Sequence, residues 1–187
     1  MKTKIINLAS RTDRWDAICL EVQKFGIETF GRFDAIEGGW VGFNHSVKEA
    51  LRNEGEILIL EDDCIFTNTI DKLQEAIKEL PNDWDLLYLG ANMKSAVMRH
   101  TGHLYRLKNA WTSHAIFYSK KGAEFCFENF DPDGGIIYDE WLRTVAQEQL
   151  KCFIIYPMLA IQADGFSDIW GANTTYGIGQ SSKHYHD

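Results

Sequence analysis

Apolar residues recur in this chain with two different periods. Short continuous runs, typical of buried strands, alternate with stretches in which apolar residues return every three or four positions, as in helices. Glycine, proline and asparagine separate these segments. The runs predict strands over residues 4–8, 30–36, 57–60, 84–89, 115–118, 153–155 and 159–162. Helical spacing predicts helices up to Gly26, from Asn44 or His45 to about Gly55, from Thr69 to Leu80, over 121–127 and over about 139–150.

Strands and helices that alternate in this order indicate an α/β fold, with helices covering a mostly parallel sheet. Two segments break the alternation. Residues 91–111 predict a long loop or small hairpin of the kind that overlies an active site. From Asp164 onward Gly, Ser, Asn and Thr dominate, which predicts a loop that either packs over the site or is disordered. With 187 residues, we expect one domain over 1–187, with 164–187 as its tail.

Composition narrows the possible functions. The formal net charge of −8 argues against nonspecific binding to nucleic acid, and 45% hydrophobic residues favour a packed globule. No apolar run reaches the roughly 20 residues that span a bilayer, and no signal-peptide core follows Met1, so we expect a cytoplasmic protein. The four cysteines show no Cys-x-x-Cys spacing, which gives no indication of a zinc site or a disulfide framework.

The most informative stretch is residues 57–63, where four apolar residues lead directly into Glu61, Asp62 and Asp63. In an open α/β sheet, ligands bind at the carboxyl ends of strands. Three adjacent carboxylates repel one another, so they either stay hydrated or hold a hard cation such as Mg²⁺ or Mn²⁺. Strand alternation turns Glu61 and Asp63 to one side, which makes them the first metal-site candidates, with a solvated acidic turn as the alternative.

A second candidate site follows the first strand. Arg11 and Arg14 lie at the expected start of a helix, where the macrodipole is positive. A helix N-terminus with two arginines can bind an anion such as a diphosphate. The alternative is a pair of solvated surface arginines, with Asp13 stabilising the first helical turn.

These segments together resemble the bacterial lipopolysaccharide glycosyltransferases of family 25, which also includes the collagen galactosyltransferases. The resemblance runs in order over nearly the whole chain. It rests on Ile5-Ile6-Asn7-Leu8 with Arg11 and Arg14, Phe33-Asp34-Ala35, Ile57 to Asp63, Trp84 to Gly90, Ser113 to Ala123, Asp139, and Gln162 with Ser167-Asp168-Ile169. One position departs from the family pattern, because Asn44 stands where the family usually has serine, and this bears on the donor-sugar preference.

The resemblance implies a GT-A fold and an inverting transfer of a hexose, usually galactose or glucose, from a UDP-sugar donor to a saccharide or other hydroxyl acceptor. It also implies a divalent cation, commonly Mn²⁺. Direct inversion needs a base that takes the acceptor's proton. Asp139 matches the family's acidic position, with Glu140 as the alternative, and an ordinary first-turn acid is the competing interpretation of Asp139.

The remaining site candidates are assigned by role. Glu61 and Asp63 are expected to hold the metal, and His184 could add an imidazole if the tail folds over the donor. The expected donor-binding residues are Asn7, Leu8, Arg11, Arg14, Asp34, Asp62 and Gln162. Two other functions stay open: a metal-dependent phosphotransfer or phosphohydrolase-like protein, and a non-catalytic nucleotide-sugar-binding module. The phosphotransfer class generally carries its key acid after the first strand, where this chain has arginines.

Overall fold

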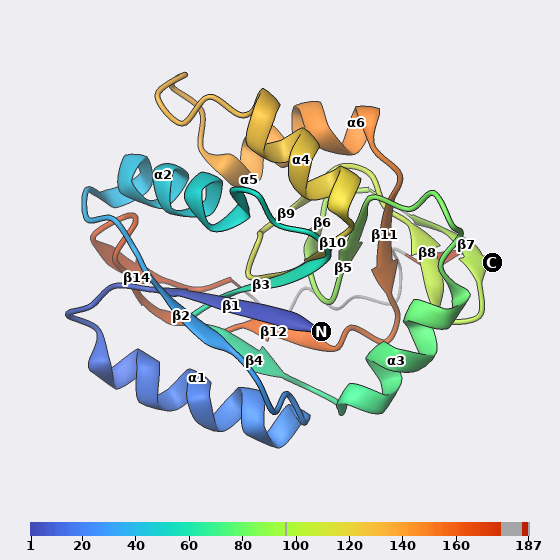
Figure 1. Cartoon of the computed structure of the whole chain (residues 1–187), viewed down its shortest axis with the longest axis horizontal. Helices are drawn as coiled ribbons and strands as arrows, with labels where there is room; N and C mark the ends of the chain where they lie inside the picture. The colour runs from blue at the N-terminus through green and yellow to red at the C-terminus, as the bar shows by residue number, and fades with distance from the viewer. Residues whose placement is uncertain (96, 177–184, 187) are drawn as a thin grey trace.

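The computed structural model of the chain describes residues 1–95, 97–176 and 185–186. A nine-stranded sheet organises these residues, in the order β15-β7-β8-β11-β5-β10-β3-β1-β2 (Figure 1). Its strands are β1 (Lys2–Asn7), β2 (Gly31–Asp34), β3 (Ile57–Glu61), β5 (Leu86–Tyr88), β7 (Val97–Thr101), β8 (Leu104–Arg106), β10 (Ala115–Tyr118), β11 (Cys152–Ile155) and β15 (Tyr185–His186). The pairs β1–β2, β1–β3 and β5–β11 are parallel, whereas β10 runs antiparallel to both β3 and β5.

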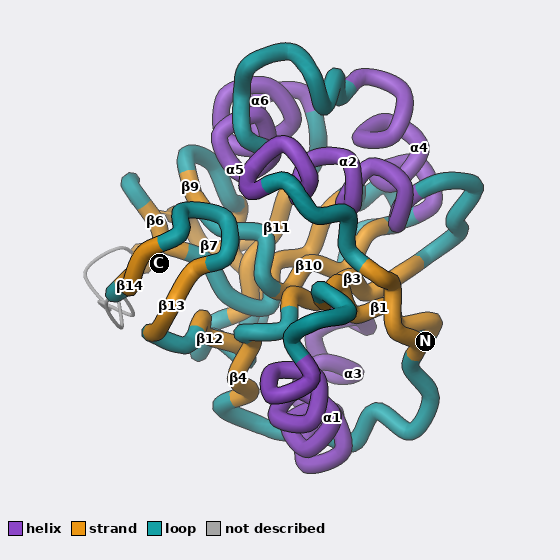
Figure 2. Tube along the Cα trace, turned by 90° about the vertical axis from the view of Figure 1, so that its left-hand side faces the viewer, coloured by secondary structure: helices purple, strands orange, loops and turns teal. Residues whose placement is uncertain are grey.

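Helices cover both faces of this sheet. On one face lie α1 (Thr12–Phe25) and α3 (Ile70–Glu79). The other face carries α2 (Gly39–Leu51), α4 (Lys120–Asn129), α5 (Tyr138–Trp141), a π-helical turn (Leu142–Ala146) and α6 (Gln147–Gln149), as Figures 1 and 2 show. None of the helices in the described part of the chain is long and apolar enough to cross a membrane.

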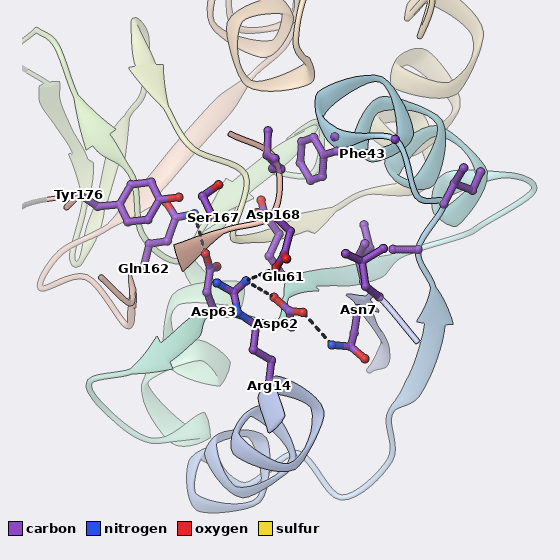
Figure 3. A pocket seen from close by; sticks show the side chains of 17 residues that line it. Asn7, Arg14, Phe43, Glu61, Asp62, Asp63, Gln162, Ser167, Asp168 and Tyr176 are labelled. Atoms are coloured by element: carbon purple, nitrogen blue, oxygen red, sulfur yellow. Dashed lines mark hydrogen bonds and ion pairs between the residues drawn. The ribbon is translucent and has the colours of Figure 1, made fainter. Parts of the chain in front are cut away.

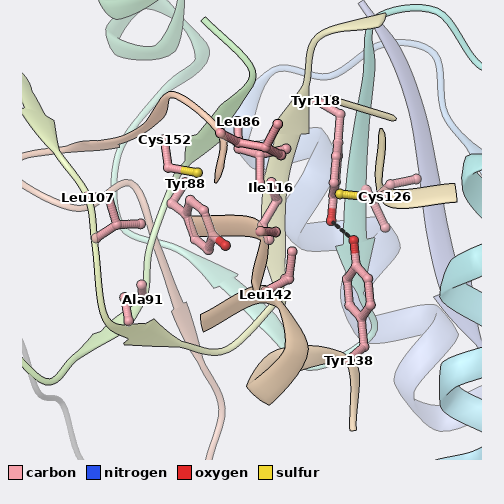
Figure 4. Packing of buried hydrophobic residues seen from close by; sticks show 14 of the residues in the cluster. Leu86, Tyr88, Ala91, Leu107, Ile116, Tyr118, Cys126, Tyr138, Leu142 and Cys152 are labelled. Atoms are coloured by element: carbon pink, nitrogen blue, oxygen red, sulfur yellow. Dashed lines mark hydrogen bonds between the residues drawn. The ribbon is translucent and has the colours of Figure 1, made fainter. Parts of the chain in front are cut away.

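The continuous apolar run of β3 is explained by these two layers. Ile57 and Ile59 are buried in the core beneath α2, α4 and α5, while Leu58 and Leu60 are buried in the core against α1 and α3. Figure 4 shows part of the first core, where the hydroxyls of Tyr118 and Tyr138 lie 3.1 Å apart. A strand buried on both faces cannot alternate polar and apolar residues, so its first exposed polar groups come at its carboxyl end.

Most predicted elements are present, with shifted ends. The first helix ends at Gly26, whose φ of 102° is the left-handed conformation that glycine adopts without steric cost. The second helix begins at Gly39, not at Asn44 or His45, and Gly38 is its N-cap residue. Gly42 allows this early start, since a Cβ there would lie 2.3 Å from the carbonyl oxygen of Ile36.

The small hairpin that we expected as one alternative for residues 91–111 is present as β7–β8. The same region also contains a short ladder between β6 (Asn92–Met93) and β9 (Ala110–Trp111), which we did not expect. A turn after β3 leads to β4 (Cys64–Phe66), which pairs with β12 (Ala160–Gln162). The start of the expected tail forms a hairpin of β13 (Gly165–Ser167) and β14 (Ala172–Thr174). All four cysteines are free thiols.

Candidate functional site

A cavity lies at the sheet edge where β1, β2 and β3 end (Figure 3). In the β1–β3 register Ile6 is opposite Glu61, so Asn7 and Leu8 extend beyond the strand beside the acidic turn. The cavity is lined by Ile6, Asn7, Leu8, Arg14, Ala35, Ile36, Gly38, Gly39, Phe43, Glu61, Asp62, Asp63, Gln162, Ser167, Asp168, Ile169 and Tyr176. Seven predicted donor or metal residues, including Gln162, therefore lie together in the lining, although up to about 150 positions separate them in the chain.

The acidic residues at the end of β3 have different hydrogen-bond partners. Asp62 accepts hydrogen bonds from Asn7 Nδ2 at 2.7 Å and from Arg14 at 2.9 Å. Asp63 lies on another side of the turn and accepts a hydrogen bond from Gln162 Nε2 at 3.0 Å. Asp62 is thus held by β1 and α1, while Asp63 is held by the strand β12.

Glu61 is linked to Asp139 by a single hydroxyl. Ser113 Oγ lies 2.7 Å from Glu61 Oε1 and 2.6 Å from Asp139 Oδ1. Because β10 is antiparallel to β3, its amino-terminal approach passes the carboxyl end of β3, and this brings Ser113 beside Glu61. A hydroxyl has one proton and donates to one carboxylate at a time, so the second contact needs a proton on a carboxyl group. Protonation of either carboxyl therefore affects the hydrogen bond that the other one makes with Ser113.

Burial and crowding disfavour ionisation of these carboxyls. Burial, followed by the nearby charges of Asp63 and Asp139, raises the pKa of Glu61 well above its usual value. Burial also raises the pKa of Asp63 to about 6 and that of Asp139 to about 6. Like charges at short distance favour a bound cation, which would stabilise the ionised forms.

Two buried oxygen atoms without hydrogen-bond partners in the described part of the chain show whether the residues beside the cavity suit a cation. Asp63 Oδ1 and Gln162 Oε1 are buried and have no hydrogen-bond partner in the described residues. Hard divalent cations take carboxylate and amide oxygens as ligands. Across residues 1–95, 97–176 and 185–186, no three His, Cys, Asp or Glu side chains converge as a metal-binding group. The unpartnered oxygens of Asp63 and Gln162 suit a hard cation, and Glu61, which lines the same cavity, is the further candidate ligand.

Both predicted arginines are balanced by carboxylates. Arg14 Nη1 lies 2.9 Å from Asp62 Oδ1 and 3.8 Å from Asp168 Oδ2. Arg11 forms ion pairs with Asp13, at 2.8 Å, and with Asp168, and it does not line the cavity. An incoming diphosphate would meet an acidic wall around one lining arginine, so the arginines alone do not make an anion site.

Other predicted residues are placed as follows. Leu8 lines the cavity, whereas the Asp34 side chain is 78% exposed and pairs with Arg32 at 3.1 Å, so Ala35 lines the cavity in its place. Glu140 is held in an ion pair with Arg143, which lowers the pKa of that carboxyl. His184 lies outside the described residues.

Asn44, the position that departs from the family pattern, is buried away from the cavity lining. Its Nδ2 donates to Pro132 O at 3.2 Å and to Ile136 O at 2.8 Å, and its Oδ1 accepts from Tyr138 N at 2.9 Å. Asn44 therefore attaches α2 to the loop that precedes Asp139. Its role here is to position α5.

Sequence reasoning gave no site role to three residues that the structure brings to the acidic turn or its cavity. Ser113 was part of the resemblance only, and nothing in its local pattern shows that β10 is antiparallel. Phe43 lies just before the predicted start of the second helix, so no helical pattern placed it. Tyr176 lies in the polar tail, where no periodicity applies, and burial with the charge of Asp63 raises its pKa to about 12. These side chains depend on long-range contacts.

Comparisons with known proteins bear on the fold. No family model matches the sequence, and no curated protein matches it. Among solved structures, A197 from STIV aligns with a TM-score of 0.51 at 11% identity, over 94% of this chain and 93% of that chain. A glycosyltransferase involved in the glycosylation of the major capsid of PBCV-1 aligns with a TM-score of 0.51 at 9% identity, over 83% of this chain and 81% of that chain. At such identities the likeness concerns the fold alone, and it confirms the expected α/β fold of the GT-A type.

Proposed function

We propose that this chain is a metal-dependent glycosyltransferase that uses a nucleotide-sugar donor. One observation carries the proposal: Glu61 and Asp63 border a cavity at the carboxyl edge of the sheet, and Ser113 links Glu61 to Asp139. Glycosyl transfer needs both parts of this arrangement. A cation bound by carboxylates neutralises the leaving diphosphate, and a carboxylate beside the reacting carbon takes the proton of the acceptor hydroxyl.

The charges of the cavity support the need for a cation. Arg14 faces Asp62 and Asp168, and Asp63 adds further negative charge at neutral pH, so a diphosphate would be repelled. Glu61, Asp63 and the amide oxygen of Gln162 would hold the ion. When bound, a divalent cation neutralises the diphosphate and stabilises its charge as it leaves. Arg14 would then contact the diphosphate beside the ion.

Asp139 is the proposed base. The acceptor oxygen forms a bond to the anomeric carbon, the diphosphate leaves with the electrons of the broken bond, and the acceptor proton passes to Asp139. A pKa of about 6 suits a carboxylate that is ionised at neutral pH yet basic enough to take a proton. Ser113 holds this carboxyl in position. Glu140 is a weaker candidate because Arg143 already binds its carboxylate.

Finer features of the proposal come from the sequence resemblance. It favours UDP as the nucleotide, galactose or glucose as the sugar, Mn²⁺ as the ion and inversion at the anomeric carbon, as in glycosyltransferase family 25. The acceptor is a saccharide or another molecule with a free hydroxyl. Lipopolysaccharide biosynthesis is the process that this family suggests.

Thermal unfolding with a panel of nucleotide sugars, in Mn²⁺ or in chelator, tests the donor site without an acceptor. A ligand at about 100 times its Kd stabilises the native state by about 2.7 kcal/mol, which for a chain of this size raises Tm by about 5–11 °C. We expect this rise with a UDP-sugar and Mn²⁺, and its loss in chelator.

The matched variants are Asp63→Ala and Asp133→Ala, which remove a cavity carboxylate and an exposed one respectively. Asp63→Ala should abolish the metal-dependent rise, whereas Asp133→Ala should keep it. Equal UDP affinity of Asp63→Ala and wild type in Mn²⁺ would disprove the metal site. No shift of the wild type with any nucleotide would disprove the donor site itself.

A further inference from the structure

The segment that leads into Ser113 carries one exposed aromatic side chain. Trp111 is 41% exposed, while its neighbours Ala110, Thr112 and Ser113 are buried. In Figure 2, β9, which contains Trp111, lies next to α5, which contains Asp139. A single exposed aromatic side chain is ordinary on a protein surface, so the case for a role of Trp111 comes from its position relative to Ser113 and Asp139.

The backbone that presents Trp111 is strained. Thr112 has a φ of 79°, a left-handed conformation that β-branched residues rarely adopt. Asn109, at the other end of β9, has a φ of 56°, which asparagine tolerates better. The conformation of Thr112 directs Ser113 inward, onto Glu61 and Asp139, and leaves Trp111 outside. Strained backbone of this kind is typical of sites where one precise side-chain position is needed.

Polar contacts fix the surroundings of the ring. Arg143 Nη1 donates to Asn109 Oδ1 at 2.9 Å, and its guanidinium also binds Glu140, the residue after Asp139. The guanidinium carbon lies 5.7 Å from the centre of the Trp111 ring. Arg143 therefore lies between the Trp111 ring and Glu140, the residue next to the proposed base.

The side from which the acceptor approaches the anomeric carbon suggests a role for the Trp111 ring. In an inverting transfer the acceptor approaches the anomeric carbon from the side opposite the leaving diphosphate. The diphosphate side is the cavity of Arg14 and Asp63, and Asp139 lies across Ser113 from Glu61. An acceptor whose hydroxyl reaches Asp139 also comes close to Trp111. Trp111 lies two positions before Ser113, which contacts Asp139, and its ring lies beside Arg143, which binds the adjacent Glu140.

We propose that Trp111 is the acceptor platform, on which a sugar ring of a saccharide acceptor stacks with one hydroxyl directed toward Asp139. This inference rests on the proposed glycosyltransferase function and adds the chemical class of its acceptor. Sugar rings present C–H groups on one face, which pack well against an indole.

Lys94 is compatible with this role. Its Nζ lies 4.3 Å from the centre of the Trp111 ring, and the side chain is exposed. A cation–π contact in water is weak, so a sugar ring can replace the ammonium group. Lys94 would then donate hydrogen bonds to the sugar hydroxyls.

Saturation-transfer NMR with methyl glycosides and simple disaccharides, in the presence of UDP and diamagnetic Mg²⁺, tests the platform directly. We expect ring-proton signals with wild-type protein, their loss in Trp111→Ala and their retention in Trp111→Phe. Met98→Ala is the matched control, because it removes another exposed apolar side chain, 68% exposed, on the strand β7. It should keep the signals.

Kinetics with an acceptor that gives turnover supply a second readout. Trp111→Ala should raise the acceptor KM about tenfold, as expected for the loss of one aromatic contact, whereas Met98→Ala should leave the acceptor KM unchanged. Equal saccharide signals in wild type and Trp111→Ala would overturn the platform, as would the absence of any saccharide signal with the wild type. Saccharide binding at Trp111 without a metal-dependent nucleotide shift would instead refute the donor site and leave the saccharide site standing.

Discussion

Replacing Asp63 with asparagine should make the metal-free protein more stable. Burial raises the pKa of Asp63 to about 6 from an ordinary value of 3.8, so the ionised form is disfavoured in the native state. This difference corresponds to at most about 3 kcal/mol of destabilisation at neutral pH, or about 6–12 °C in Tm. An asparagine Oδ1 can still accept the hydrogen bond from Gln162, so the substitution removes charge with little loss of contact.

The pH dependence follows from the sign of this shift. Between pH 3.8 and about 6 the native state binds more protons at Asp63 than the unfolded state does, so stability falls as pH rises through this range. The advantage of Asp63→Asn should be absent below about pH 4 and complete above about pH 7. Saturating Mn²⁺ should close most of the gap, because it stabilises the wild type by about 2.7 kcal/mol at 100 times its Kd and leaves the variant unchanged.

Urea unfolding, followed by tryptophan fluorescence from pH 4 to 8 in chelator and in Mn²⁺, measures these differences. Asp133→Asn is the control, because it makes the same substitution at an exposed carboxylate. It should change stability by less than about 0.5 kcal/mol. If Asp63→Asn is less stable than wild type in chelator at pH 7, the ionised Asp63 carboxylate does not destabilise the metal-free protein, and the reasoning is refuted.

Three further variants test other parts of the structure. Asp139→Asn should bind donor normally in a thermal-shift assay but lose transfer, and if turnover survives, the base is Glu140 or another group. Gly42→Ala should destabilise the protein by about 2 kcal/mol, because its Cβ would lie 2.3 Å from a carbonyl oxygen, whereas Gly31→Ala, with open space around it, should be neutral. Burial lowers the pKa of His114 to about 4 from 6.5, so wild-type stability should lose about 3 kcal/mol from this group as pH falls from 6.5 to 4. His114→Asn should remove that loss in a difference curve of the two proteins, and an unchanged curve would contradict it.

The core strands were predictable because burial on two faces leaves a clear trace in the sequence. Ile57 to Leu60 must be apolar at every position, and the acidic turn that follows marks the carboxyl edge of the sheet. Gly26 was an equally clear signal, since a helix end in the left-handed conformation favours glycine. Local chemistry was enough for these features.

The connections between distant segments were not predictable in the same way. The antiparallel direction of β10 is a property of the whole sheet, and it alone decides that Ser113 meets Glu61. Asp34 was expected at the donor because it ends a strand, but its side chain turns outward to Arg32. For Arg11 and Arg14, helix position indicated the right region, whereas their partner Asp168 comes from a segment with no periodic pattern.

The hairpin β13–β14 has a consequence for synthesis. Ser167, Asp168 and Tyr176 line one part of the cavity, whereas Asn7, Glu61 and Asp63 come more than 100 residues earlier in the chain. A nascent chain shorter than 176 residues lacks part of this lining. On the ribosome, the acidic turn after β3 emerges long before the segment that covers it, so this edge of the sheet stays uncovered while the rest of the chain is made.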